Sequence, residues 1–408
     1  MRRSISLVAV LATALSLAAC SSSTDAPAAD AKTTAAAAGG SLTIWVDETR
    51  KPAVEAAAAA FEKETGSTVT LVQKNFDDIR ADFLAQVPTG EGPDITVGAH
   101  DWLGEMTKNG VVAPIELGDK VKDFEPVSIS AFTQDGQVYG LPYAVENIAL
   151  IRNTALAATA PATWDDAITA GKAAGKTYPI LVQMGAEGDP YTMYPLQTSF
   201  GAPVFTQNAD GSYAAELALG GEPGTAFASW LAAQGAAKVL DPAITYDIAV
   251  AAFAAGESPY IVGGPWMIDS FPGLDLAIDP IPSAGGQPAQ PFVGVAGFYV
   301  NAKSKNVLLA NDFLVNFMST EDAQGALYKA GNRPPALIAA ADTASADPIT
   351  AGFRAVGADA VPMPSIPEMG SVWSFWGVTE AGIVSGAQEP VASWTKMVSD
   401  IQGALDAS

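Results

Sequence analysis

One stretch decides the expected fold, namely Val138-Tyr-Gly-Leu-Pro-Tyr-Ala-Val-Glu-Asn-Ile-Ala-Leu-Ile-Arg-Asn153. Its residues favour β-strand, and apolar side chains flank Glu146 and Asn147 on both sides, which predicts that both polar groups are buried. A buried carboxylate without partners is costly, so Glu146 needs hydrogen bonds, a cation or the hydroxyls of a ligand. We interpret the stretch as a crossing from one lobe to another, with Glu146 facing a ligand between them. The alternative is an ordinary central strand in which a neighbouring arginine pairs with Glu146.

The N-terminus has the order of regions that is typical of a secretory signal. Two arginines precede an apolar run that is too short to span a membrane. The run ends in Leu17-Ala-Ala-Cys20, which resembles the lipobox of bacterial lipoproteins, and this cysteine is the only one in the chain. We therefore expect residues 1–20 to be a lipoprotein signal peptide, with Cys20 lipidated and the protein held at the extracellular face of the cell membrane. Residues 21–40 are expected to be a flexible tether.

Size and charge exclude several classes of protein. The part from Ser41 to Ser408 is longer than one hydrophobic core usually organises, so two lobes are expected. The formal net charge of −23 argues against nucleic acid as a partner. His100 is the only histidine and the single cysteine lies in the signal, so we expect neither a metal site nor another cofactor. No second apolar run reaches transmembrane length, which predicts a soluble body outside the membrane.

The order of strand and helix patterns predicts an α/β fold. Residues 42–46, 68–72 and 94–97 are typical of strands, and helical patterns at 52–64 and 76–87 separate them. This βαβαβ order predicts a doubly wound lobe with a parallel sheet, in which ligands lie beyond the carboxyl ends of the strands.

A second α/β pattern follows the crossing stretch, and helical patterns complete the chain. The expected helices are 164–174, 227–236, 247–255, 307–318, 320–330, 371–385 and 390–405, and the expected strands are 178–182, 259–264 and 291–300. The last of these strands is a candidate for a second crossing. We expect the N-terminal lobe to comprise residues 41–145 and 298–344, and the C-terminal lobe 146–297 and 345–408. Lobes joined by several crossings would close around a ligand by hinge motion.

The ordered motifs resemble those of the maltose-binding protein and its relatives, the extracellular sugar-binding subunits of ABC importers. The resemblance runs from about Ser41 to the C-terminus. It rests on Leu42-Thr-Ile-Trp45, Phe61-Glu-Lys-Glu-Thr-Gly66, Gly92-Pro-Asp-Ile95, Ala99-His-Asp101, Ala144-Val-Glu146, Pro190-Tyr191, Gly264-Pro-Trp266, Pro291-Phe-Val-Gly-Val295 and Met363-Pro-Ser-Ile-Pro-Glu-Met369. It implies a periplasmic-binding-protein-like fold of two hinged α/β lobes with a C-terminal helical segment. It also implies a monomer that binds an oligosaccharide, such as maltose or a maltodextrin, and delivers it to a permease.

The resemblance further implies the residues of the ligand site. Asp101, Glu146 and Tyr191 match family positions that bond sugar hydroxyls or line the cleft. Trp266 and Trp373 match aromatic residues that stack against sugar rings. The full set of candidate ligand-binding residues is Glu48, Arg50, Asp101, Trp102, Glu146, Asp189, Tyr191, Tyr246, Trp266 and Trp373.

Several positions depart from the family pattern. Gly98 stands where the maltose-binding protein has a tryptophan, and Trp102 and Gly377 stand where it has arginines. The turn after the first strand is rearranged, with Arg50 near a basic family residue and Glu48 as a substitute for a missing carboxylate. These changes leave a sugar as the expected ligand, but they make another disaccharide, such as trehalose, an alternative to maltose.

Carboxylates and indoles suit a sugar, because carboxylates accept strong hydrogen bonds from hydroxyls and aromatic rings cover apolar C–H faces. A secreted glycoside hydrolase that uses two of Asp101, Glu146 and Asp189 as acid and base is the alternative from another class. A non-sugar solute, such as a polyamine or a phosphate ester, is the alternative within the binding class. We expect a binding protein rather than an enzyme, since a binding fold accounts for the length.

Other aromatic and acidic residues are expected to be structural. Asp77 and Asp78 lie near a helix start, where carboxylates interact favourably with the helix dipole. The indoles expected in the core are Trp45, Trp164, Trp230 and Trp394.

Overall fold

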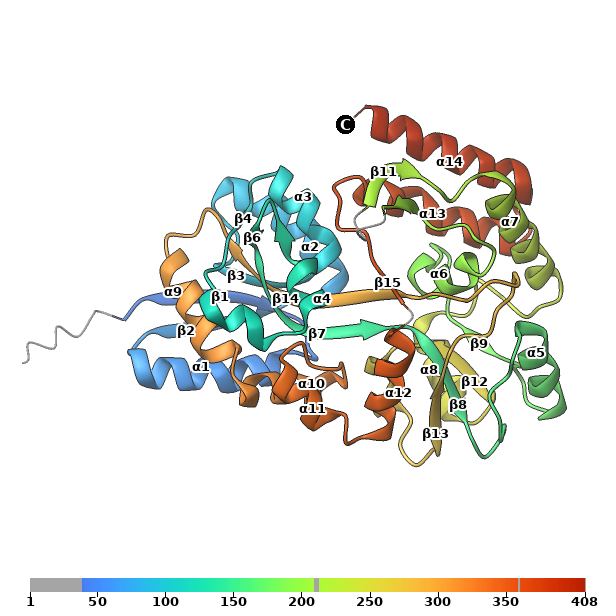
Figure 1. Ribbon diagram of the computed structural model, residues 1–408, viewed down its shortest axis with the longest axis horizontal. Helices are drawn as coiled ribbons and strands as arrows, with labels where there is room; N and C mark the ends of the chain where they lie inside the picture. The colour runs from blue at the N-terminus through green and yellow to red at the C-terminus, as the bar shows by residue number, and fades with distance from the viewer. Residues whose placement is uncertain (1–38, 209–212, 359, 408) are drawn as a thin grey trace, which may run out of the picture. The chain divides into compact units, whose positions relative to one another are not determined.

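The computed structural model describes residues 39–208, 213–358 and 360–407. The expected signal peptide with Cys20, and all but the end of the expected tether, lie outside the described residues. Among the described helices, none is long and apolar enough to cross a membrane. The described chain contains two large sheets with separate cores, and we call the two α/β parts the first lobe and the second lobe (Figure 1).

A seven-stranded mixed sheet forms the centre of the first lobe. Its strands are β1 (Ser41–Val46), β2 (Thr68–Gln73), β3 (Ile95–Ala99), β4 (Val112–Ala113), β7 (Gly140–Asn147), β14 (Phe292–Asn301) and β15 (Val361–Pro362). Strands β1, β2 and β3 are parallel, as the βαβαβ pattern predicts. However, β14 runs antiparallel to both β3 and β7, so the sheet as a whole is mixed.

The helices of the first lobe follow from local sequence signals. Helix α1 (Lys51–Thr65) has Pro52 in its first turn, and it is capped by Gly66, whose φ of 70° is the left-handed conformation that glycine adopts most readily. In α2 (Phe76–Gln86) the side chain of Asn75 accepts a hydrogen bond from the Asp77 backbone N–H and caps the helix. The other helices are α3 (Leu103–Lys108), α4 (Pro126–Ala131), α9 (Val307–Asp312), α10 (Glu321–Gly331) and α11 (Ile338–Ala344). The helix expected at 307–318 is confirmed in its extent, but its second half, Phe313–Met318, is π-helical rather than α-helical.

A four-stranded sheet forms the centre of the second lobe. Its strands, in spatial order, are β13 (Leu276–Asp279), β8 (Ala149–Asn153), β12 (Tyr260–Gly263) and β9 (Leu181–Val182). Around it lie α5 (Trp164–Ala173), α6 (Pro190–Thr198), α7 (Gly221–Ala236), α8 (Tyr246–Ala254), α12 (Pro348–Gly357), α13 (Met369–Val384) and α14 (Pro390–Asp406). Two short hairpins pair β5 (Thr133–Gln134) with β6 (Gln137–Val138) and β10 (Phe205–Gln207) with β11 (Tyr213–Leu217).

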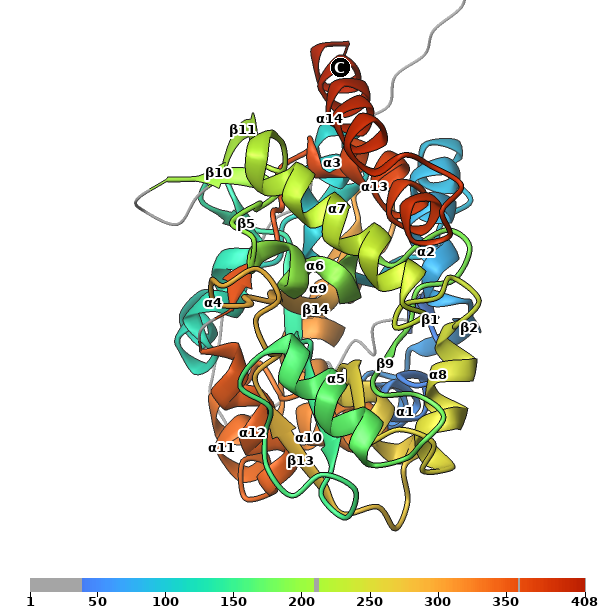
Figure 2. The ribbon, with the colours of Figure 1, turned by 90° about the vertical axis from the view of Figure 1, so that its right-hand side faces the viewer.

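Helices α7, α13 and α14 pack together as a layer of the second lobe (Figure 2). A Cβ atom on Gly235 of α7 would lie 2.0 Å from the carbonyl oxygen of Val384 at the end of α13. The absence of a side chain at this position is therefore what lets the two helices approach so closely.

The stretch from Val138 to Asn153 divides into two strands that belong to different sheets. Up to Asn147, β7 pairs with β14 in the first lobe, and from Ala149 onward β8 pairs with β12 and β13 in the second. The chain thus crosses between the lobes at Ile148. Because β7 and β14 are antiparallel neighbours, the second crossing through β14 lies beside the first (Figure 1). The exact lobe boundaries given above stay predictions.

Candidate functional site

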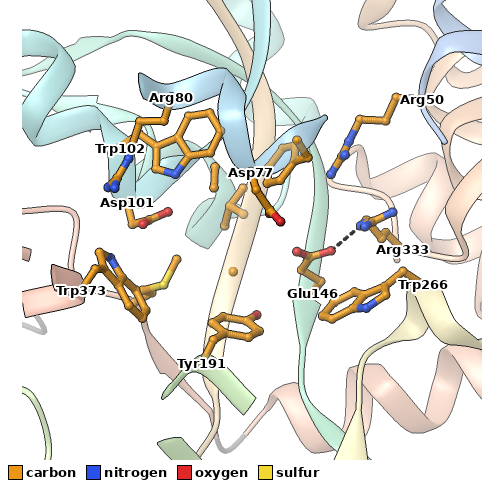
Figure 3. A pocket seen from close by; sticks show the side chains of 15 residues that line it. Arg50, Asp77, Arg80, Asp101, Trp102, Glu146, Tyr191, Trp266, Arg333 and Trp373 are labelled. Carbon is orange, nitrogen blue, oxygen red and sulfur yellow. Dashed lines mark hydrogen bonds and ion pairs between the residues drawn. The ribbon is translucent and has the colours of Figure 1, made fainter. Parts of the chain in front are cut away.

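Side chains from both lobes line a cavity of about 470 Å³ beside the crossing strands. The lining residues are Arg50, Phe76, Asp77, Arg80, Ala99, Asp101, Trp102, Glu146, Tyr191, Trp266, Gly294, Val295, Arg333, Met363 and Trp373 (Figure 3). A second cavity of about 700 Å³ shares Arg50, Phe76, Asp77, Trp266 and Arg333 with the first, and Glu48 and Tyr246 also line it. The two cavities adjoin at these shared residues, and we call them together the cleft.

Charged residues gather at two places in the cleft, with Tyr191 between them (Figure 3). We call the first the Glu146 end, which comprises Glu146, Arg333, Trp266 and Arg50. We call the second the Asp101 end, which comprises Asp101, Arg80, Trp102 and Trp373.

At the Glu146 end the carboxylate already has a cationic partner. The Nε of Arg333 donates a hydrogen bond of 2.6 Å to Oε2 of Glu146, and the guanidinium lies 5.3 Å from the ring of Trp266. Glu146 therefore has an arginine partner, as the alternative interpretation expects, and it also lines the cleft, while its contact with a ligand stays a prediction. The ion pair orients the carboxylate, because the planar guanidinium donates in a fixed direction.

Arg50 forms a buried cluster next to this ion pair. Its guanidinium donates to Asp47 and to the hydroxyl of Tyr143, and it lies 4.6 Å from the ring centre of Phe76. Although burial alone would raise the pKa of Asp47, the charge of Arg50 and its hydrogen bonds lower that pKa below its usual value. This corner of the cleft is thus held rigidly by charge-assisted hydrogen bonds.

At the Asp101 end the carboxylate has an atom without a partner. Asp101 is only 9% exposed, and its Oδ1 has no hydrogen-bond partner among the described residues. Burial raises its pKa to about 6, although Arg80 and the Trp373 side chain act in the opposite direction. The ring centres of Trp102 and Phe76 are 5.2 Å apart, and both rings line the same cavity as Asp101.

Tyr191 provides a hydrogen-bond donor on the opposite wall. It lies in the first turn of α6, and its buried hydroxyl has no partner among the described residues. Burial, with Glu146 as the next cause, raises its pKa well above the usual value, so the hydroxyl keeps its proton. A Cβ atom on Gly294 would lie 3.1 Å from this hydroxyl and 3.3 Å from Cγ of Glu146, so glycine keeps the floor of the cleft open.

Comparison with known proteins adds to this geometry. A sequence profile of the bacterial extracellular solute-binding proteins matches residues 56–352. The chain belongs to this family. This solute-binding protein is 29% identical to the maltodextrin-binding protein of Bacillus subtilis, over 92% of this chain and 90% of the relative. It is 26% identical to a galactooligosaccharide-binding protein of the same organism, over 97% and 96% of the two chains.

A solved structure gives the same result for the fold. The maltotriose-binding protein of Thermus thermophilus, bound with maltotriose, superposes with a TM-score of 0.81 at 31% identity, over 89% of this chain and all of that chain. The expected two-lobed, periplasmic-binding-protein-like fold is therefore confirmed. The family consists of binding proteins, so the solute-binding protein is not an enzyme, and the glycoside hydrolase alternative is rejected.

The cleft brings together all of the candidate ligand-binding residues except Asp189. That carboxylate caps α6 instead, because Oδ1 accepts from the Thr192 N–H at 3.1 Å and Oδ2 accepts from the Thr192 hydroxyl at 2.7 Å. Gln183 donates to Oδ2 as well. The expectation that Asp189 faces the ligand does not agree with this structure, since helix capping occupies its oxygens.

Sequence analysis missed several lining residues, of which Asp77, Arg80 and Arg333 are charged. Asp77 does lie at a helix start, as expected, but that helix start also borders the cleft. Arg80 follows one turn later on the same face of α2, and this spacing is a signal that could have been used. No local signal marks Arg333, because its partner Glu146 is 187 residues away in the sequence.

The structure gives a steric reason for the departures from the family pattern. A Cβ atom on Gly98 would lie 2.7 Å from the ring of Trp102, so the glycine makes room for that indole. A Cβ atom on Gly377 would lie 2.4 Å from the carbonyl oxygen of Glu187, so this glycine lets the loop before α6 approach α13.

His100 is structural. Its Nδ1 accepts a hydrogen bond from the Val295 N–H at 3.0 Å, and its Nε2 lies 3.0 Å from the carbonyl oxygen of Met363. These two contacts of the ring join β14 to the segment before α13. Burial lowers its pKa to about 4, so the ring is neutral at physiological pH. Within the described ranges, no group of three histidine, cysteine or acidic side chains could hold a metal ion.

Proposed function

We propose that this solute-binding protein captures a maltodextrin-type oligosaccharide in the cleft and delivers it to the permease of an ABC importer. One observation carries the proposal: the cleft combines buried hydrogen-bonding atoms that lack partners within the described chain with aromatic side chains. Asp101 Oδ1 and the Tyr191 hydroxyl supply those atoms, and Trp102, Trp266 and Trp373 line the same cavity.

A pyranose ring matches this combination chemically. Its hydroxyls lie around the rim and would donate to carboxylates or accept from Tyr191, while its C–H faces would cover indoles. A cleft of this kind rejects an analogue that lacks a hydroxyl, because the buried polar atom is then left unpaired. A purely apolar solute would leave Asp101 Oδ1 desolvated without compensation.

The comparisons support the α-glucan class without deciding chain length. Relatives are named for binding maltodextrin and maltotriose, and a further relative is named as a solute-binding lipoprotein of a maltooligosaccharide ABC transporter. A galactooligosaccharide-binding relative makes galactosides the alternative ligands.

Isothermal titration calorimetry of residues 38–408, which form one compact unit, tests the proposal. The ligand series is maltose, maltotriose, maltotetraose, trehalose, a galactotriose and cellotriose. We expect binding by the α-glucans that is weakened in Trp373→Ala and kept in Trp230→Ala, because Trp230 packs against the core of the second lobe and lines neither cavity of the cleft. Binding of galactosides alone, or of none of these sugars, would reject the α-glucan assignment.

The lipid anchor is a separate part of the proposal, supported by the Leu17-Ala-Ala-Cys20 motif. Full-length protein expressed in a lipoprotein-processing bacterium should fractionate with membranes, and Cys20→Ser should move it to the soluble fraction. Equal partitioning of the two proteins would contradict the anchor.

Closure of the lobes around the ligand is also proposed. The two neighbouring crossings at β7–β8 and β14 support it, because such strands can act as a hinge. Small-angle scattering of the proposed monomer should show a smaller radius of gyration with maltotriose than without it. An unchanged radius at saturating ligand would contradict hinge closure.

A further inference from the structure

Arg80 lines the Asp101 end of the cleft but lacks a strong ion pair. Among the described residues its ion-pair partner is Glu105 on α3, and the Nη1 to Oε2 distance of 3.8 Å is long for a hydrogen bond. Its side chain is 32% exposed, so this contact with Glu105 contributes little stability. In Figure 3 the guanidinium lies beside Trp102, on the side of the cleft where Asp101 is found.

Asp101 needs a cation more than any other carboxylate that lines the cleft. Glu146 is bonded to Arg333, and Asp77 lies at an exposed helix start, whereas Asp101 is buried with Oδ1 unpartnered in the described chain. Ionised, Asp101 can accept hydrogen bonds from two sugar hydroxyls at once. Protonated, it must use one oxygen as a donor, and the charge assistance is lost.

We propose that Arg80 is a positioning residue that keeps Asp101 ionised at neutral pH, and thereby preserves its capacity to accept hydrogen bonds from a sugar. This inference rests on the proposed function, because it assigns a role to Asp101 in the same cleft. Arg80 acts through its charge across the cleft wall and not through contact with the ligand.

Among the groups of the described residues that face Asp101, Arg80 is the cation. Glu105 on α3 is negative and opposes ionisation of Asp101, while Tyr191 on α6 and Tyr299 on β14 are neutral because burial raises their pKa values. Trp373 on α13 is neutral as well. Burial raises the pKa of Asp101 to about 6, and among the groups that lower this pKa the charge of Arg80 has the largest effect.

Two measurements on residues 38–408 test the proposal. The first follows the carboxyl ¹³C shift of Asp101 against pH in ligand-free protein labelled at aspartate, with Asp101→Asn for assignment. The wild-type midpoint should lie near 6, and Arg80→Met should raise it by about one pH unit, the lower end of the range for a nearby opposite charge. Arg80→Lys should restore the wild-type midpoint, and Glu105→Gln should lower it. This readout does not depend on any sugar.

The second measurement is the Kd for maltotriose between pH 5 and pH 8.5. Because the ionised form binds, wild-type affinity should be complete above the Asp101 pKa and fall as the pH drops through it. Arg80→Met should weaken binding about threefold near pH 6.5, by close to the tenfold limit of a one-unit shift near pH 5, and little at pH 8.5. Arg354→Met, which does not line the first cavity, is the matched control.

Three outcomes would overturn the inference. One is an Asp101 titration midpoint that is unchanged in Arg80→Met. Another is a loss of maltotriose affinity that is equal at every pH, because that result would indicate direct contact of Arg80 with the sugar. The third is failure of Arg80→Lys to restore the profile, which would assign the effect to packing. Absence of maltotriose binding by the wild type would reject the proposed ligand, while the ¹³C titration would still decide the role of Arg80.

Discussion

The two ends of the cleft each place a carboxylate beside an indole, but they differ in what those carboxylates contact. Glu146 is bonded to Arg333 at 2.6 Å, whereas Asp101 keeps one oxygen unpartnered within the described chain. The first arrangement is set before a ligand arrives, and the second gains a hydrogen bond only when a ligand provides it. We therefore infer that the Glu146 end serves both stability and binding, while the Asp101 end serves binding at some cost in stability.

Substitution of the two carboxylates should have the largest effects and should separate these roles. We expect Asp101→Asn and Glu146→Gln each to weaken maltotriose binding about tenfold or more, since a hydrogen bond to a charged group contributes about 1.5–3 kcal/mol. Only Glu146→Gln should also destabilise the ligand-free protein, by about 1 kcal/mol, because the acceptor of the Arg333 hydrogen bond becomes a neutral amide oxygen. Calorimetric titration and urea unfolding measure both quantities. Equal losses of stability in the two variants would remove the distinction.

Removal of the indoles should give the next largest effects. We expect Trp373→Ala and Trp266→Ala each to weaken binding by about 1–2 kcal/mol, because each ring contributes apolar area and specific stacking. Trp266→Ala should additionally disturb the ion pair, since Arg333 lies over that ring at 5.3 Å. The pair Trp266→Ala and Glu146→Gln should therefore be non-additive in a double-mutant cycle, whereas Trp373→Ala and Glu146→Gln should add.

A smaller effect is expected from the glycine that makes room for Trp102. Gly98→Ala would place a Cβ atom 2.7 Å from that ring, so the indole must move away from its position at the Asp101 end. We expect maltotriose affinity to fall about threefold, as a modest displacement of a packed side chain costs under about 1 kcal/mol of binding. Gly325→Ala is the matched control, because a Cβ atom there has open space. Full affinity in Gly98→Ala would show that the position of Trp102 does not matter for the ligand.

A third buried carboxyl outside the cleft should affect affinity least. Both oxygens of Glu380 are buried without partners in the described chain, and burial, with Asp189 as a further cause, raises its pKa well above the usual value. A group with a raised folded-state pKa gives its full stability below the unfolded-state pKa, and that stability is lost as the pH rises through the folded-state pKa. Glu380→Gln removes this pH dependence. Relative to the wild type, the free energy of unfolding of the variant should therefore rise by up to about 1.4 kcal/mol per pH unit above pH 5.

Thermal unfolding from pH 5 to pH 8 measures this effect, with maltotriose affinity as the second readout. A parallel pH dependence in Glu380→Gln and wild type would show that Glu380 does not hold a proton. A large loss of affinity would show instead that Glu380 acts on the cleft.

Much of the architecture could be predicted because its signals are local. The alternation of apolar residues in 42–46, 68–72 and 94–97 marks the parallel strands, and the polar pair Glu146-Asn147 marks the crossing. Proline hid one element, because Pro195 argues against the interior of the helix that α6 nevertheless forms, although Pro190 is favourable at its first position. The antiparallel placement of β14 could not be predicted, since the partners of a strand lie far away in the sequence.

The family, the two-lobed α/β fold and about half of the polar and aromatic residues that line the cleft could be read from the sequence, because motifs and periodicity are properties of neighbouring residues. Which of those residues have partners depends on the folded chain. Folding paired Glu146 with Arg333 across 187 positions, engaged Asp189 in capping α6 and left Asp101 with an unpartnered oxygen among the described residues. The physical reason is that hydrogen bonding and desolvation depend on distances between atoms from remote segments, and those distances exist only once the chain has folded.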